Sequence, residues 1–126
     1  MTHLADVCAL LAFFGAADNP MTKTGRSAMQ GKVWVSPVTV WELTRKAYLG
    51  KIPPLPSPTG SFTRHLLQLG FQFQELSWEG AERANRLPPY HKDPMDRMLI
   101  ATALTEDMTI ITDDRQFASY GVKTVW

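Results

Sequence analysis

Short apolar strand patterns alternate with helix patterns along the whole chain, and this alternation limits the possible folds more than any other feature of the sequence. Strands are predicted at residues 2–6, 33–35, 71–76, 108–111 and 122–126. Helices are predicted at residues 9–14, 20–30, 37–49, 61–70, 77–87 and 94–106. Such an order is typical of an α/β domain in which helices cover both faces of a parallel sheet.

Three helix starts carry a capping residue followed by proline. Ser36-Pro37 and Asp93-Pro94 combine a side chain that accepts a hydrogen bond from the first turn with a ring whose fixed φ suits that turn. Asn19-Pro20 carries the same signal for an earlier, polar helix. The last helix is apolar over most of its surface, which indicates that it is largely buried.

The composition indicates one folded domain covering residues 1–126, because 126 residues with 44% hydrophobic content suffice for one core. The net charge of +1 excludes a histone-like basic field. The single cysteine, Cys8, excludes an intramolecular disulfide and a zinc–thiolate cluster, so a reducing, cytoplasmic location is expected. The apolar run at 7–17 follows an acid, has no preceding Lys or Arg and is short, so neither a signal peptide nor membrane attachment is expected.

The aromatic residues are expected to serve packing. Trp41 and Tyr48 recur at helical spacing, and we interpret them as core residues rather than as a platform for stacked bases. All four tryptophans are interpreted in the same way. Residues 51–60 hold four of the nine prolines and are expected to form an irregular connection.

Four acidic residues from distant segments fall where strands end or helices begin. Asp6 ends the first strand, and Asp114 follows the strand at 108–111. Glu42 lies in the second turn of a helix, and Asp96 lies in the first turn of the buried helix. In a parallel sheet these positions meet at one edge, so we expect the four carboxylates to converge.

Crowded carboxylates repel one another, and a divalent cation relieves that repulsion. Oxygen ligands without cysteine or clustered histidine favour Mg²⁺ or Mn²⁺. A site of this kind suits the hydrolysis of phosphodiester bonds, because the cation activates water and stabilises charge on the phosphate.

Each acid also has a purely structural interpretation. Asp6 can end a strand at a turn, and Glu42 can pair with the lysine four residues later. Asp96 can complement the helix dipole, Asp93 is interpreted as the N-cap, and residues 113–114 can form a turn.

Other common sites have no support in the sequence. His3, His65 and His91 show no zinc-binding spacing. No GxGxxG, GxxxxGK[ST] or GxSxG string occurs, so dinucleotide-binding, Walker-type and serine-hydrolase chemistry are not indicated.

Four segments together cover most of the chain. They are LADVCALLAFF at 4–14, VWVSPVTVWELTRKAYLGKI at 33–52, LPPYHKDPMDRMLIATAL at 87–104 and MTIITDDRQFASYGVKTVW at 108–126. The sequence resembles, on these segments, the PIN-domain ribonucleases, and specifically the VapC-type toxins of bacterial toxin–antitoxin pairs. The HKDPMDRMLIATA and ITDDRQFASYGV strings are the most specific parts of the resemblance.

The resemblance implies a three-layer α/β/α sandwich with a mostly parallel sheet. It implies an endoribonuclease that depends on Mg²⁺ or Mn²⁺, is inhibited by a cognate VapB-type antitoxin and forms a homodimer. The family's catalytic, metal-binding acids fall on Asp6, Glu42, Asp96 and Asp114. Asp6 and Asp96 are expected to hold the metal most directly. Glu42 or Asp114 is expected to help deprotonate the attacking water.

Further residues near these acids are expected to have supporting roles. Asp93 adds an acid, and Ser36 and Thr112 match small hydroxyl positions that would orient a ligand or water. Asp113 falls where the family varies, so Asp114 is preferred. The sequence departs from the family pattern in having Cys8 where a histidine is frequent, and the preceding valine replaces a frequent Thr or Ser.

Three basic residues flank the acids in the sequence and are candidates for binding the RNA backbone. They are Arg45, Lys46 and Arg97, and a solvated helix face is the alternative interpretation.

Two other functions are compatible with an acidic α/β domain. A phospho-accepting signalling receiver needs an Asp that ends a central strand and a Lys that ends a later one, and no Lys follows the strand at 108–111. A protein that binds an antitoxin-like peptide without activity is the other alternative, with the Pro-rich segment and the N-terminal helices as its surface.

Overall fold

The computed structural model describes residues 2–126 and contains one sheet of five parallel strands in the order β3-β2-β1-β4-β5. The strands are β1 (His3–Ala5), β2 (Val33–Val35), β3 (Gln72–Phe73), β4 (Thr109–Ile111) and β5 (Thr124–Val125). The predicted α/β fold with a parallel sheet is therefore confirmed.

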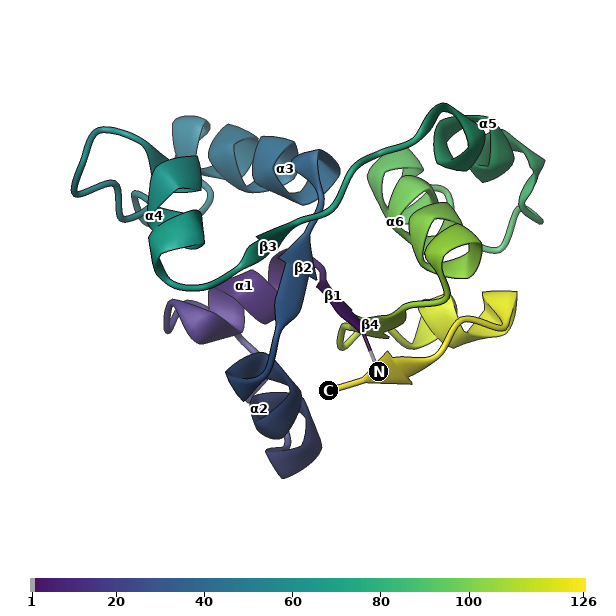
Figure 1. The fold of residues 1–126 in the computed structure, drawn as a ribbon, viewed down its shortest axis with the longest axis horizontal. Helices are drawn as coiled ribbons and strands as arrows, with labels where there is room; N and C mark the ends of the chain where they lie inside the picture. Colours follow the sequence, from purple (N-terminus) through teal and green to yellow (C-terminus); the bar gives the residue numbers. More distant parts are fainter. Residues whose placement is uncertain (1) are drawn as a thin grey trace.

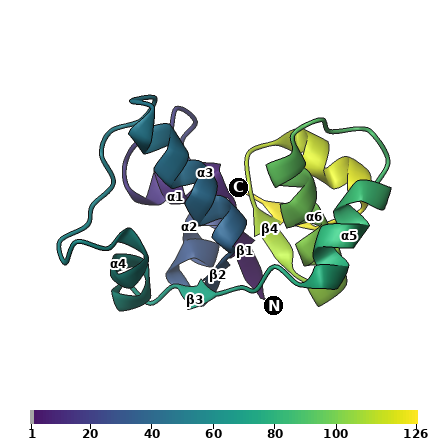
Figure 2. The same cartoon turned by 90° about the horizontal axis from the view of Figure 1, so that it is seen from above.

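Six α-helices and one 3-10 helix connect these strands within residues 2–126. They are α1 (Val7–Phe13), α2 (Lys23–Gln30), α3 (Pro37–Tyr48), α4 (Phe62–Gln68), α5 (Trp78–Arg86), α6 (Pro94–Glu106) and η1 (Arg115–Tyr120). Figures 1 and 2 show α1 to α4 on one side of β1, and α5, α6 and β4 on the other. Across residues 2–126, the helices lack the length and apolar character that crossing a membrane would need.

The central strands β1 and β4 are buried on both faces, and successive side chains of each strand point to opposite faces. Leu4 pairs with Ile110, and both belong to a core that includes residues of α6 and η1. Ala5 pairs with Ile111, and both belong to a second core built with residues of α1 and α4, against which α2 also packs. The two cores produce the three layers predicted from the sequence.

Several element ends differ from the predictions because a different residue supplies the cap or the partner strand. Asp6 caps α1, which therefore begins two residues early, at Val7. The helix predicted at 20–30 begins only at Lys23, because Thr22 rather than Asn19 is its N-cap. The first and last strands are shorter than predicted, and η1 was not predicted.

The predicted strand at 71–76 is reduced to the two residues of β3. Its only partner strand among the described residues is β2, which ends at Val35 because the next residue, Ser36, is the N-cap of α3. One further hydrogen bond follows, from the Gln74 amide to the Val35 carbonyl, and the ladder then has no partner. The length of β3 is thus set by its neighbour and not by its own alternating pattern.

The interpretation of Trp41 and Tyr48 as core residues is wrong, since their exposed fractions are 52% and 88%. Helix α3 buries a different face, formed by Val38, Thr39 and Leu43. The interpretation of all tryptophans as packing residues fails as well, because Trp78 is 95% exposed.

Candidate active site

The acids gather at the carboxyl edge of the two central strands. Strands β2 and β3 lie on one side of β1, and β4 and β5 lie on the other. The chain connections that leave β1 and β4 therefore run in opposite directions, which makes the gap between these two strands a topological switch point. Ligands of open α/β sheets bind at such a switch point. Asp6 directly follows β1, and its amide donates to the Ile111 carbonyl at the end of β4 (3.2 Å).

Asp6 is buried at this edge and caps a helix. Its Oδ1 accepts a hydrogen bond from the Ala9 amide at 2.9 Å, which makes it the N-cap of α1, and its exposed fraction is 4%. Burial raises the pKa of its carboxyl to about 7, against the lowering effect of hydrogen bonds from Thr112 and Ala9. The negative charges of Asp96 and Asp113 raise this pKa further.

Asp96 lies in the first turn of α6, and its electrostatic partners come from three other segments. Burial is the main reason that its pKa rises to about 7, followed by the charge of Asp93. The charges of Glu42 and Asp114 raise the pKa further, while His91 opposes the rise. The structure thus brings α3, α6 and the segment after β4 together around this carboxylate.

Glu42 contributes a buried oxygen that nothing satisfies. Its Oε2 is inaccessible to solvent and has no hydrogen-bond partner among residues 2–126. The pKa of its carboxyl is raised, mainly by burial and then by the charge of Asp93. The positive charge of Lys46 lowers this pKa. Lys46 nevertheless forms no ion pair with Glu42 within the described structure, so Glu42 is not half of the exposed pair considered from the sequence.

The carboxylates of Asp114 and Asp96 both lie close to the side chain of His91. The Nε2 atom of His91 lies 2.9 Å from Asp114 Oδ2 and 3.1 Å from Asp96 Oδ2. One ligand atom from each of the three residues lies within 4.8 Å of the others, a spacing that a metal ion can bridge. The other carboxylate oxygen of Asp114 accepts from the Gln116 amide at 2.9 Å and caps η1.

Two residues near the acids, His91 and Asp113, were not predicted from the sequence as part of the site. His91 lies in a loop and matches no zinc motif, and the available signal was its position in the same HKDPMD segment as Asp96. Asp113 lies near Asp6 and Cys8, and its negative charge therefore raises the pKa of both groups. Burial is the main cause of the raised pKa of the Cys8 thiol, which stays protonated and is a poor metal ligand.

The smaller auxiliary residues act mainly as local caps. Ser36 is fully buried, and its Oγ accepts from the Val38 amide at 3.1 Å. Thr112 accepts from the Asp114 amide at 3.1 Å, and Asp93 accepts from the Met95 amide at 2.9 Å. These bonds orient the segments that carry the acids.

The structure gives Arg97 a different role from the predicted contact with RNA. Its guanidinium donates to four backbone carbonyls, those of Ala84 and Leu87 at 2.8 Å, Pro88 at 2.9 Å and His91 at 3.3 Å. It therefore joins the end of α5 and the following loop to α6. With these donors engaged, we do not retain Arg97 as a candidate for binding RNA.

Arg45 and Lys46 lie on α3 beside the site. The guanidinium of Arg45 is exposed and lies 5.4 Å from the centre of the Trp41 ring, as in a cation–π pair. Lys46 is half-buried, and its charge lowers the pKa of Glu42.

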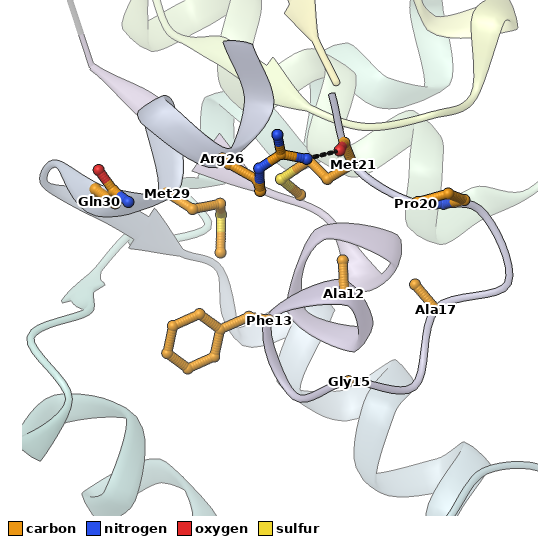
Figure 3. Close-up of a pocket in the computed structure, with 9 residues that line it drawn as sticks. All are labelled: Ala12, Phe13, Gly15, Ala17, Pro20, Met21, Arg26, Met29 and Gln30. Carbon is orange, nitrogen blue, oxygen red and sulfur yellow. Dashed lines mark hydrogen bonds between the residues drawn. The ribbon is translucent and has the colours of Figure 1, made fainter. Parts of the chain in front are cut away.

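A separate hollow between α1 and α2 has a different chemical character (Figure 3). Apolar side chains such as Phe13, Met21 and Met29 line it. Its Arg26 donates a hydrogen bond to the Met21 carbonyl at 2.6 Å, and among residues 2–126 no carboxylate lines the hollow. It is therefore not part of the acidic site.

The family model of the PIN domain matches residues 4–123. This chain belongs to the PIN-domain family. The match covers Asp6, Glu42, Asp96 and Asp114, and it leaves the signalling-receiver alternative without support. The comparison with curated proteins gives no significant match.

Solved structures share the fold of this PIN domain over nearly its whole length. FitAcB from Neisseria gonorrhoeae has a TM-score of 0.69 and 16% identity, covering 99% of this chain and 97% of the other. A toxin–antitoxin complex from Klebsiella pneumoniae has a TM-score of 0.67 and 19% identity, with the same coverage. VapBC2 from Rickettsia felis, bound to a DNA fragment from its promoter, has a TM-score of 0.67 and 13% identity, covering 100% and 99%.

Proposed function

We propose that this PIN domain is an endoribonuclease that depends on Mg²⁺ or Mn²⁺ and acts in the cytoplasm as the toxin of a toxin–antitoxin pair. The observation that carries the proposal is the buried, unpartnered Oε2 of Glu42 beside a cluster of carboxylates. An oxygen in that state costs free energy unless something that binds there satisfies it.

The residues fit a divalent cation. Asp6, Glu42, Asp96 and Asp114 offer hard oxygen donors, and the pKa values of Asp6 and Asp96 are raised to about 7 in the absence of a cation. A bound cation would favour the charged carboxylates and supply the activation of water and the stabilisation of phosphate charge that hydrolysis needs. Asp6 and Asp96 would hold it most directly.

Other residues of the site would bind the substrate and accept a proton from water. Glu42 is a candidate to accept a proton from the attacking water, because its pKa is raised and one of its oxygens has no hydrogen-bond partner within residues 2–126. Lys46 and Arg45 would attract the RNA backbone from α3. Asp114 would complete the carboxylate set.

Two partners follow from the same proposal. The structural neighbours include a toxin–antitoxin complex from Klebsiella pneumoniae and VapBC2 from Rickettsia felis, which supports a VapB-type antitoxin as the inhibitor of this chain. An arginine from such an inhibitor would pair well with clustered carboxylates. We also propose a homodimer, as the resemblance to VapC-type toxins implies.

RNA cleavage by purified protein tests the proposal. The wild-type chain is incubated with a mixed RNA pool in Mg²⁺, Mn²⁺ or EDTA, beside Asp96→Asn. We expect cleavage only with a cation, and a loss of at least about a hundredfold in Asp96→Asn, as when a group acting on the transition state is removed.

Asp107→Asn is the matched control, because it makes the same chemical change at the exposed opposite end of α6. It should cleave like the wild type. Equal cleavage by Asp96→Asn and the wild type would refute the assignment. Binding of an antitoxin without cleavage of any RNA would favour the inactive-binder alternative.

A further inference from the structure

His91 lies between two carboxylates of the candidate metal site. Its Nε2 lies 2.9 Å from one oxygen of Asp114 and 3.1 Å from one oxygen of Asp96, so a single ring atom bridges two carboxylates from different segments. Its side chain is 11% exposed. Such a bridge is compatible with two opposite roles: a ligand that joins the metal, or a donor that takes the metal's place.

The other ring nitrogen decides between these roles. Nδ1 of His91 accepts a hydrogen bond from the backbone amide of Asp93 at 3.2 Å. A nitrogen that accepts an N–H carries no proton itself, so in the neutral ring the proton resides on Nε2. The Nε2–H therefore donates to Asp114 and lies 3.1 Å from the Asp96 carboxylate, and Nε2 has no lone pair free for a metal.

The ring is fixed in this position by contacts on other sides. It packs edge-on against Phe117, with 5.7 Å between ring centres and 78° between ring planes. The backbone amide of His91 donates to the Tyr120 hydroxyl at 2.7 Å, and that hydroxyl donates to the Pro88 carbonyl at 2.7 Å. These contacts fix the position of the Nε2–H donor of His91 in the site.

We propose that the Nε2–H of His91 occupies the space between Asp96 and Asp114 in the metal-free protein, so that a divalent cation must displace it in order to bind. The proposal rests on the metal-dependent function proposed above. His91 is then a positioning residue that keeps the two carboxylates together when no cation is present, and it weakens the binding of the cation by competition.

Two substitutions separate the functions of the two ring nitrogens. His91→Asn places a side-chain oxygen where Nδ1 accepts from the Asp93 amide, as in an Asx turn, and leaves no donor that reaches the carboxylates. His91→Gln places an amide donor near the position of Nε2. Asp96→Asn identifies the binding signal that belongs to this site.

Calorimetric titration with Mn²⁺ alone tests the competition. We expect His91→Asn to bind Mn²⁺ about tenfold more tightly than the wild type, since a hydrogen bond to a charged group no longer has to be broken. His91→Gln should stay close to the wild-type affinity. A loss of fold would weaken binding, so tighter binding cannot come from structural damage.

Weaker binding of Mn²⁺ by His91→Asn would overturn the proposal and make His91 a metal ligand. Unchanged binding would overturn it as well, while leaving the nuclease proposal intact. A wild-type chain that binds no Mn²⁺ and cleaves no RNA would refute both proposals.

Nitrogen NMR of the imidazole provides a readout that is independent of affinity. The metal-free protein should show His91 with its proton on Nε2, and saturation with Mg²⁺ should change the signals of this ring. A proton on Nδ1 in the metal-free protein, or ring signals that do not respond to Mg²⁺, would contradict the displacement.

Discussion

At the scale of the single residue, the ionised carboxylate of Asp6 destabilises the folded chain. With the pKa raised to about 7 by burial, its ionisation at pH 8 costs folding free energy. Asp6→Asn keeps an oxygen for the Ala9 amide and removes the charge. We expect it to raise the free energy of unfolding of the metal-free protein at pH 8 by about 2–4 kcal/mol, since one pKa unit corresponds to about 1.4 kcal/mol and the pKa lies about three units above 3.8.

Urea denaturation in EDTA measures this effect, and Asp18→Asn is the control. Asp18 is exposed, so its substitution should change the free energy of unfolding by less than about 0.5 kcal/mol. Asp6→Asn should also lose the stabilisation by Mg²⁺. A variant that is less stable than the wild type at pH 8 would contradict the assigned cost of the buried charge.

At the scale of the element, Arg97 holds α5 and α6 together. Its substitution by Ala leaves carbonyls of residues 84, 87, 88 and 91 without this donor. We expect Arg97→Ala to lower the free energy of unfolding by about 2–4 kcal/mol, because hydrogen bonds to a charged group are worth about 1.5–3 kcal/mol each and add incompletely. Arg86→Ala, which removes only an exposed pair with Glu82, should cost less than about 1 kcal/mol.

Equilibrium unfolding in urea compares the two arginine variants. Equal losses for both would show that the bonds of Arg97 to the backbone do not stabilise the structure. A stable Arg97→Ala variant with weakened RNA binding would restore Arg97 as a residue that contacts RNA.

Helix α3 gives a second prediction at this scale, because its apolar residues lie on two faces. Leu43 is fully buried, whereas Trp41 is 52% exposed. We expect Leu43→Ala to destabilise the fold by about 2–5 kcal/mol and Trp41→Ala to cost less than about 1.5 kcal/mol. Urea denaturation of the two variants decides the matter, and a larger loss for Trp41→Ala would place that residue in the core after all.

At the scale of the whole molecule, pH and the cation act in opposite directions. The pKa values of Asp6 and Asp96 are about 7 in the folded chain, above the ordinary value of 3.8. Their contribution to stability is therefore complete below about pH 4 and is lost as the pH rises through about 7. The melting temperature of the metal-free protein should fall between pH 5 and pH 8.

Mg²⁺ should restore stability at pH 8 by binding the native state, and much less at pH 5, where the carboxyls are protonated. Thermal unfolding with EDTA and with Mg²⁺ at both pH values checks this pattern. The Asp96→Asn variant should show a smaller dependence on pH and little response to Mg²⁺. A metal-free melting temperature that rises from pH 5 to pH 8 would contradict the prediction.

The sequence by itself determined the features that depend on neighbours within one helical turn. Ser36 and Asp93, each followed by proline, predicted the exact starts of α3 and α6, because a capping bond joins residues only two or three positions apart. Asp6 and Asp114 were predicted as site residues from their positions just after apolar strands, whereas their roles as N-caps of α1 and η1 were not predicted. Short apolar strands alternating with helices likewise predicted a parallel sheet.

Only the tertiary structure decided the features that depend on contacts between distant segments. The length of β3, the exposed position of Trp41, the anchoring of Arg97 and the meeting of His91 with Asp114 each depend on a partner from another element. Residues 91 and 114 belong to different elements, and no local pattern encodes their distance. Packing of α6 and η1 against one face of the sheet brings them together, because burial of apolar surface fixes where each element lies.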